Sequence, residues 1–261
     1  MAVKLSICIP TYNRAVHLSN CLKSIADSRG YDHALVEVCV ADNCSSDDTS
    51  TVVADAQVDI PIVYYRAERN QGRVINYLKV VEMAQGEFVW LIGDDDLLLP
   101  SSLVTILGLL NSQQGIDYFF VNSYCLSTDY VLAKGSSFST FSLPENMPTF
   151  APMGINGRMP FFRMIDPDVS FDFLGAMFLS IFRRKLWDAN AATLDSDAVI
   201  DEREFSHFDN TFPHVRVFAA AFYQSNAYRC DTPLSVNLAG AREWSSKSPL
   251  INIVRLPEAL N

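Results

Sequence analysis

The chain lacks an excess of positive charge: its 261 residues carry 20 Lys and Arg against 30 Asp and Glu, a net charge of −10. A protein that binds nucleic acid needs a basic face for the phosphates, so we expect no nucleic-acid partner. No window approaches the ~20 apolar residues that span a bilayer. The first four residues lead directly into a strand-like run, without the pattern of a signal peptide. We therefore expect no transmembrane segment and a cytoplasmic location, with peripheral association at the inner face of the membrane left open.

Several motifs that would carry chemistry are also missing. The chain has no GxGxxG dinucleotide fingerprint, GK[ST] phosphate loop, HExxH zinc motif or GxSxG nucleophile elbow. The six cysteines have no CxxC spacing, which is typical of buried thiols in a reduced protein. If the chain binds a nucleotide, another group must neutralise its phosphates, and a metal ion is the obvious choice.

The apolar pattern that is present predicts an α/β fold. Short apolar runs predict strands at 5–10, 36–41, 62–65 and 88–92, and 3.6-residue periodicity predicts helices around 18–25 and 74–81. Strands that alternate with helices imply a mostly parallel central sheet with helices on both faces. The pattern weakens after residue 112. There it predicts a long loop at 134–160, a strand at 173–182 continuing to Trp187, a helix at 212–223 and a poorly patterned tail at 238–261.

Three consecutive aspartates follow the fourth predicted strand, in the stretch FVWLIGDDDLLLP at 88–100. Two unit charges about 4 Å apart repel by roughly 4 kcal/mol at an effective dielectric constant near 20. A solvated acidic turn is one interpretation. The other is a site for Mg²⁺ or Mn²⁺, which prefer oxygen ligands. Polar residues also follow the first two strands, at 11–14 and 42–43, and ligands bind at this edge of such sheets. We therefore favour the metal site.

Four motifs in order carry a resemblance to a known family. IPTYNR at 9–14, VADNCSSDDT at 40–49, RNQG at 69–72 followed by Asn76, and GEFVWLIGDDDLLLP at 86–100 resemble the family 2 inverting glycosyltransferases, which have the GT-A fold. The second half, with GAMFLSIFRRKLW and FPHVRVF, more loosely resembles the abequosyltransferase-like members that build bacterial O-antigen and other surface polysaccharides. The resemblance implies a GT-A fold, with residues 1–115 forming the nucleotide-sugar-binding half and 116–261 the acceptor-binding half of one domain.

The resemblance also implies roles for single residues. The implied nucleotide-binding residues are Pro10, Thr11, Tyr12, Arg14, Asp42, Asn70, Gly72, Arg73, Asp94 and Arg242. The family commonly ends its fourth strand with Asp-x-Asp-Asp, and Gly93 stands here in place of the first aspartate. In that register Asp95 is the principal metal ligand and Asp96 supports it. A second register makes Asp94-x-Asp96 the metal motif.

The catalytic base is expected in the second half. Direct displacement at the anomeric carbon needs a carboxylate to take the proton of the acceptor hydroxyl. Glu202, Glu204 and Asp209 are candidates, and Asp209 is preferred because the positive end of the helix at 212–223 would hold a carboxylate there ionised. A helix cap is the alternative role for Asp209. His214 is a candidate third metal ligand, with a structural histidine as the alternative.

The segment 242–247 resembles a flexible closing loop, in which Arg242 and Lys247 would reach the diphosphate and Trp244 would cover the sugar. An ordinary exposed loop is the alternative.

These observations together predict a Mn²⁺- or Mg²⁺-dependent inverting glycosyltransferase. It would move a sugar from a nucleoside-diphosphate sugar to a hydroxyl of a glycan or lipid-linked glycan, in bacterial surface polysaccharide synthesis. A non-catalytic nucleotide-sugar-binding homologue is the alternative, and a Mg²⁺-dependent nucleotidyltransferase or phosphatase is a weaker one. If the aspartates repel one another without metal, Asp95→Asn should leave the metal-free protein as stable as before or more stable.

Overall fold

A computed structural model describes residues 2–135, 138–154, 156–165, 172–242, 245–255 and 257–258. Its strands form one mixed sheet in the order β3-β2-β1-β4-β8-β6-β9-β5, and β7 pairs with β9 beside this path. The strands are β1 (Leu5–Thr11), β2 (Val36–Asp42), β3 (Ile62–Arg66), β4 (Phe88–Leu91), β5 (Leu97–Leu98), β6 (Tyr118–Ser127), β7 (Gly157–Pro160), β8 (Ser180–Arg183) and β9 (Asn226–Ala239).

The first four strands are parallel and carry the predicted alternation with helices. β1, β2 and β4 are buried along their whole length, because helices cover both faces of this part of the sheet. The helices of this half are α1 (Ala15–Ala26), α2 (Thr49–Ala56), α3 (Arg73–Glu82) and α4 (Ser102–Ser112), with a 3-10 turn η1 (His33–Leu35). The predicted α/β architecture is confirmed here.

The second half adds antiparallel pairs to the same sheet. β4 pairs with β8, and β8 with β6, both antiparallel, while β6 runs parallel to β9. The helices of this half are α5 (Thr128–Leu132), α6 (Arg184–Asn190), α7 (Ser196–Val199), α8 (Phe208–Thr211), α9 (Pro213–Phe222) and α10 (Ser248–Arg255). Its 3-10 turns are η3 (Phe161–Ile165), η4 (Asp172–Leu174), η5 (Met177–Leu179), η6 (Ala191–Thr193) and η7 (Ser245–Lys247).

Two predictions for the second half are wrong in detail. The expected strand at 173–182 consists of η4 and η5 followed by the short β8, and Trp187 lies in α6. The apolar residues there fill the core, but most of them lie in 3-10 turns and not in extended backbone. Sequence alone cannot tell a strand from a helical turn when an apolar run is this short. The tail from 238 contains the end of β9 and the helix α10.

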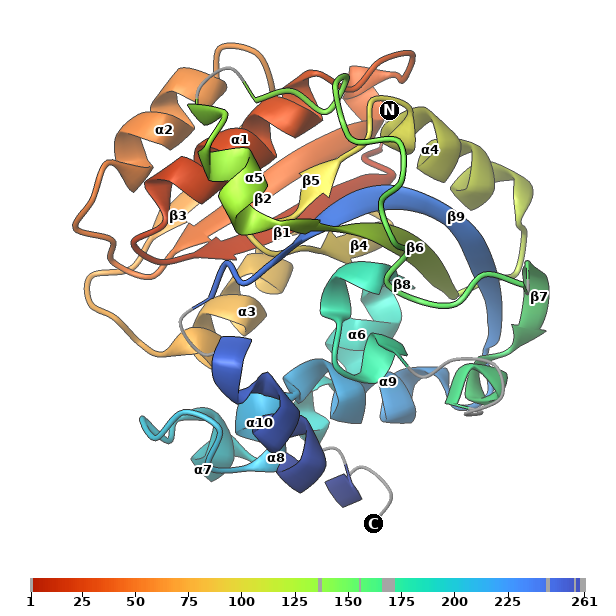
Figure 1. The fold of residues 1–261 in the computed structure, drawn as a ribbon. Helices are drawn as coiled ribbons and strands as arrows, with labels where there is room; N and C mark the ends of the chain where they lie inside the picture. Colours follow the sequence, from red (N-terminus) through yellow and green to blue (C-terminus); the bar gives the residue numbers. More distant parts are fainter. Residues whose placement is uncertain are drawn as a thin grey trace.

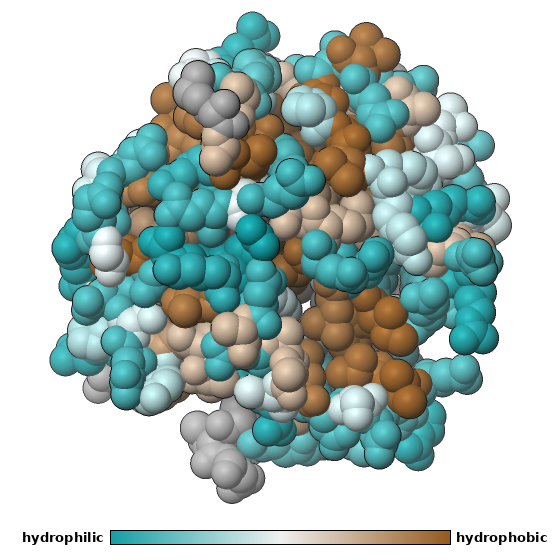
Figure 2. Space-filling view, turned by 180° about the vertical axis from the view of Figure 1, so that it is seen from behind, coloured by the Kyte–Doolittle hydropathy of each residue, from teal (hydrophilic) through white to brown (hydrophobic). Residues whose placement is uncertain are grey.

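The layers are visible in Figure 1. Helices α1 and α2 cover one face of the sheet, and α3, α6 and α9 cover the other, while α7, α8 and α10 gather beside α3 and α9. The back of the molecule in Figure 2 is largely hydrophilic, with apolar side chains in separate groups. Among the described residues, no helix is long and apolar enough to cross a membrane.

Candidate active site at the carboxyl edge of the sheet

The carboxyl ends of β1, β2 and β4 bring the predicted polar residues together. In the parallel register Thr11 lies beside Asp42, and Asp94 follows the end of β4 two residues after Ile92. Thr11 donates its hydroxyl to Asp94 Oδ2 at 2.8 Å, and Arg14 Nε donates to Asp94 Oδ1 at 2.7 Å. The sequence motif of the first strand therefore contacts the aspartate cluster directly.

Asp95 is held by two arginines that are far apart in the sequence. Arg242 donates from Nη2 to Asp95 Oδ1 at 2.9 Å and from Nε to Oδ2 at 3.2 Å, and Arg14 Nη2 lies 3.1 Å from Oδ2. Burial alone would raise the pKa of Asp95, but the Arg242 guanidinium, followed by Arg14, brings that pKa below its usual value. The expectation of uncompensated repulsion at Asp95 is therefore wrong, because the fold supplies two cations that sequence reasoning did not pair with it.

Asp96 has a different environment. Its Oδ2 accepts the Gly93 N–H at 2.7 Å and its Oδ1 accepts Asn237 Nδ2 at 3.0 Å, and the side chain is completely buried. Burial, with the Asp95 charge second, raises the pKa of Asp96 to about 7. The same two causes raise the pKa of Asp94 to about 6. The three aspartates are thus one ionised carboxylate between two arginines, flanked by two carboxyl groups that hold protons more tightly.

Gly93 leaves the space in which this cluster fits. A Cβ at this position would meet Arg242 Nη2, and would lie 2.5 Å from Asp95 Oδ1 and 3.1 Å from Asp96 Oδ2. Arg242 therefore lies in the space that the side chain of an aspartate at position 93, the first residue of the Asp-x-Asp-Asp pattern, would need.

A second polar cluster lies at the end of β2. Asn43 Nδ2 donates to Asn70 Oδ1 at 2.7 Å, and Asn70 Oδ1 also accepts the Gly72 N–H at 2.9 Å. Gly72 has a φ of 90°, which favours glycine, and it directly precedes α3. Asp42 is completely buried, with Oδ1 accepting the Ser45 N–H at 2.8 Å. The Asn-x-Gly motif thus fixes the loop that leads into α3.

Asp42 also binds a tyrosine that the sequence analysis did not select. Tyr64 donates its hydroxyl to Asp42 Oδ2 at 2.8 Å, and Arg66 Nε lies 3.5 Å from the same oxygen. Burial, then the hydrogen bond to Asp42, raises the pKa of Tyr64 above its usual range. Both oxygens of Asp42 therefore have hydrogen-bond partners within the protein.

A cavity of about 400 Å³ lies between the two halves of the chain, within the size range of ligand pockets. Four predicted site residues line it: Arg73, Asp95, His214 and Arg242. The rest of the wall is mainly apolar and aromatic, and includes Tyr77, Phe150, Met177, Phe178, Phe205, Phe212 and Ile251. Among the remaining predicted residues, Pro10 lies within buried β1 and Tyr12 is exposed.

The expected metal-ligand set is not assembled. Asp95 and His214 line the same cavity, but the described part of the chain contains no group of three His, Cys, Asp or Glu side chains placed to hold a metal ion. Asp96 bonds to Gly93 and Asn237, and the nearly buried His214 belongs to α9, where burial lowers its pKa to about 4. The hard carboxylate of Asp95, at the cavity wall, suits Mg²⁺ or Mn²⁺ in chemistry. A cation would share or take the oxygens that Arg242 holds.

Asp209 lies in the short helix α8, before α9, and is nearly fully buried. Its Oδ1 accepts Arg216 Nε at 2.5 Å and its Oδ2 accepts the Asp195 N–H at 2.8 Å. It is not among the residues that line the cavity, although Thr211 and Phe212 are. Glu202 and Glu204 are exposed in the loop before α8.

Asn237 and Phe205, like Tyr64, were not predicted from the sequence. Asn237 holds Asp96 and lines the cavity, and Phe205 lines it with a backbone φ of 62°. Asn237 was missed because β9 was not predicted, although the run at 226–239 alternates in places. Nothing in the sequence marks Phe205. Glu243 and Trp244 of the predicted closing loop lie outside the described residues.

Comparison with known proteins decides the family. Residues 6–169 match the profile described as Glycosyl transferase family 2. The chain belongs to glycosyl transferase family 2. The match covers the four motifs and the first part of the second half, so the resemblance stated from the motifs is confirmed.

The curated proteins that align with this chain include two bacterial transferases. Abequosyltransferase RfbV of Salmonella typhimurium is 27% identical over 220 residues, which cover 84% of this chain and 61% of that protein. A Campylobacter jejuni enzyme described as GalNAc(5)-diNAcBac-PP-undecaprenol beta-1,3-glucosyltransferase is 38% identical over 121 residues, covering 46% of this chain and 38% of that protein. The chain thus spans less than two thirds of the length of either relative.

Two solved structures share the fold. TarS 1-349 of S. aureus in complex with UDP-GlcNAc aligns with a TM-score of 0.65 and 17% identity, over 94% of this chain and 61% of that one. The mannosyltransferase PcManGT of Pyrobaculum calidifontis, in complex with GDP-Man and Mn²⁺, aligns with a TM-score of 0.60 and 14% identity, over 99% of this chain and 63% of that one. The fold is GT-A, as predicted.

Proposed function

We propose that this family 2 chain transfers a sugar, with inversion, from a nucleoside-diphosphate sugar to a hydroxyl of a glycan or lipid-linked glycan. The proposal rests on the position of Asp95, which lines the cavity between the two halves and accepts a hydrogen bond from Arg242 there. Residues 1–115 would bind the donor and 116–261 the acceptor. The Campylobacter relative's lipid-linked substrate and the Salmonella relative's sugar support a role in bacterial surface polysaccharide synthesis.

Asp95 would hold Mn²⁺ or Mg²⁺, which when bound neutralises charge on the departing diphosphate. Arg14 and Arg242 supply further positive charge at the same place, and guanidinium groups bind phosphate oxygens well. Asp42, at the end of β2, would accept a hydrogen bond from the nucleotide base. For that, Tyr64 has to give up the Asp42 oxygen that it now holds.

Asp209 remains our proposed base. To act as one, its carboxylate has to release the hydrogen bond from Arg216 and accept one from the acceptor hydroxyl. We expect Asp209→Asn to lose most of the transfer activity. Glu202→Gln and Glu204→Gln, in the exposed loop, serve as matched variants. If one of these two abolishes transfer and Asp209→Asn does not, the base is in the loop.

Donor hydrolysis and thermal shift test the proposal together. We expect UDP, GDP or dTDP to raise the melting temperature in Mn²⁺, because a ligand of the folded state stabilises it. The matching nucleotide sugar should then be hydrolysed slowly in Mn²⁺ and far more slowly in EDTA. Binding without hydrolysis or transfer would favour the non-catalytic homologue, and binding of none of the three would contradict the donor site.

A further inference from the structure

Arg73 is the first residue of α3 and belongs to the donor half, where it contacts Tyr77 of the same helix, but it also reaches the other half. Its Nη2 donates to the carbonyl oxygen of Asn210 at 2.9 Å, and its guanidinium carbon lies 4.8 Å from the centre of the Phe205 ring. Its Nε is buried, with no acceptor among the residues that the structure describes. A buried N–H without a partner is costly, so this donor is suited to a ligand oxygen in the cavity that Arg73 lines.

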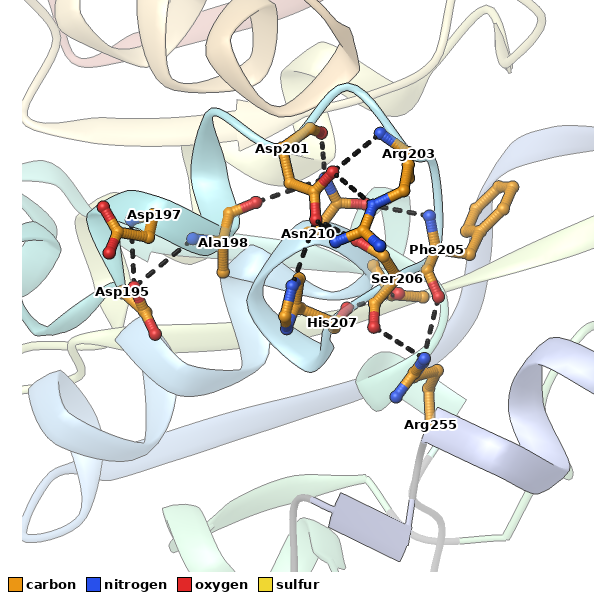
Figure 3. A network of polar contacts seen from close by, with 11 residues as sticks. Asp195, Asp197, Ala198, Asp201, Arg203, Phe205, Ser206, His207, Asn210 and Arg255 are labelled. Carbon is orange, nitrogen blue, oxygen red and sulfur yellow. Dashed lines mark hydrogen bonds and ion pairs between the residues drawn. The ribbon is translucent and has the colours of Figure 1, made fainter.

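Asn210 holds together the loop that Arg73 contacts, as Figure 3 shows. Its Oδ1 accepts the Phe205 N–H at 2.8 Å, and its Nδ2 donates to the carbonyl oxygens of Asp201 at 2.9 Å and Ala198 at 3.3 Å. Phe205 adopts a φ of 62°, a left-handed conformation that is unusual for a bulky residue. The surrounding bonds therefore impose the backbone geometry of this loop.

The other side of the loop is fixed from the C-terminal helix. Arg255 of α10 donates from Nε to the Phe205 carbonyl at 2.9 Å and from Nη2 to the Ser206 carbonyl at 2.7 Å. Inside the loop, the Asp201 carboxylate accepts the Arg203 N–H at 2.9 Å and the Ser206 hydroxyl at 3.0 Å (Figure 3). All of these hydrogen bonds join the loop to residues of the acceptor half. Arg73 reaches the loop from the donor half.

We propose that Arg73 is a positioning residue that couples the bound nucleotide sugar to the segment 201–210. The unpaired Nε–H takes a phosphate or hydroxyl oxygen of the donor, while Nη2 and the guanidinium face fix Asn210 and Phe205. Asp209, the proposed base, is the residue before Asn210. Arg73 therefore orders the acceptor side of the cavity in addition to the nucleotide contact that the motif resemblance implied. This inference rests on the proposed function for the donor contact and the kinetics, whereas the contacts of Arg73 with Asn210 and Phe205 stand without it.

Hydrogen exchange of the full, metal-free chain tests the structural part without any ligand. Arg73→Met keeps an apolar stem but removes the charge and the donors. We expect the amides of Phe205, Thr211 and Phe212 to exchange about 10-fold faster in this variant, since it loses one charge-assisted hydrogen bond. Lys79→Ala, on the same helix with a surface partner in Glu82, is the matched control and should leave these amides unchanged. Equal exchange in Arg73→Met and wild type overturns the inference.

Kinetics test the coupling. We expect Arg73→Met to lower kcat by about 10-fold or more, to raise the donor KM through the lost Nε contact, and to raise the acceptor KM through the less ordered segment 201–210. A rise in the donor KM alone would overturn the inference and restore Arg73 as a simple nucleotide contact. If wild type transfers no sugar from any donor, the proposed function fails, and the exchange experiment still decides whether Arg73 orders the segment.

Discussion

Arg242 and Asp95 form a two-point ion pair at the cavity wall, with Nη2–Oδ1 at 2.9 Å and Nε–Oδ2 at 3.2 Å. The pair joins the end of β4 to the segment after β9, which lie 147 residues apart in the chain. Arg14 adds a second cation, 3.1 Å from Asp95 Oδ2, and donates to the Ala241 carbonyl at 2.6 Å. The oxygens that suit a divalent cation are thus already neutralised by the protein.

The first prediction concerns stability without metal. Asp95→Asn should lower the free energy of unfolding by about 3 kcal/mol, because it removes the carboxylate that the partly buried Arg242 bonds at two points and one of the two carboxylates beside Arg14. Urea unfolding in EDTA measures this, with Asp27→Asn, which removes a surface pair with Lys23, as the control expected to change little. An Asp95→Asn protein as stable as wild type would mean that the two arginines do not stabilise the cluster.

The second prediction concerns competition between Arg242 and the cation. Arg242→Gln removes the charge that holds both Asp95 oxygens, so Mn²⁺ should bind about tenfold more tightly, a change of about 1.4 kcal/mol. Calorimetric titration of the nucleotide-free protein with MnCl₂ measures the affinity, and Lys23→Ala serves as a control for the loss of one positive charge. Weaker or unchanged Mn²⁺ binding in Arg242→Gln would show that the cation does not use Asp95 in place of Arg242.

The third prediction concerns the space at Gly93. Gly93→Ala places a methyl group against Arg242 Nη2 and 2.5 Å from Asp95 Oδ1, so the ion pair has to open. We expect a loss of about 1–3 kcal/mol in unfolding free energy, typical of overpacking. Gly108→Ala is the control, because Gly108 lies within α4 with open space around its Cβ position and alanine favours helix by up to about 1 kcal/mol. Equal stability of the two variants would contradict the crowding.

The fourth prediction concerns pH. Burial raises the pKa of Asp96 to about 7 in the folded protein, from an ordinary value of 3.8, so the folded state holds this proton more tightly than the unfolded chain. Stability contributed by the protonated form is present below about pH 4 and is lost as the pH rises toward 7. Asp96→Asn cannot lose that proton, and its amide can still pair with Gly93 and with a flipped Asn237.

The unfolding free energy of Asp96→Asn relative to wild type should therefore increase between about pH 4 and 7, by at most about 1.4 kcal/mol per pH unit, and level off above pH 7. Denaturation in EDTA at a series of pH values measures the difference, in which groups common to both proteins cancel. A difference that stays constant over this range would place the pKa of Asp96 near its ordinary value.

The sequence by itself determined the first half of the molecule and the position of its acidic cluster. Local signals suffice there, because β1, β2 and β4 are short buried apolar runs and each is followed by a polar motif at the same edge of a parallel sheet. The Asn70-x-Gly72 turn and the start of α3 are likewise local, since they depend on a glycine at positive φ. The three aspartates therefore lie at the edge of the sheet that the motifs predicted, with Asp94 and Asp95 beside Thr11 and Arg14.

Only the tertiary structure decided how those aspartates are charged and what faces them. The partners of Asp95 and Asp96 include Arg242 and Asn237, which come from β9 and the segment after it. Phe205 lines the cavity because hydrogen bonds with Asn210 and Arg255 hold its backbone there, and a periodic sequence pattern does not predict such bonds. The bonds from Arg255 to Phe205 and from Arg242 to Asp95 join residues 50 and 147 positions apart in the chain, so they depend on how the whole chain folds. Sequence spacing records which residue types are available, but the free energy of a charge depends on which groups the fold brings within a few ångströms of it.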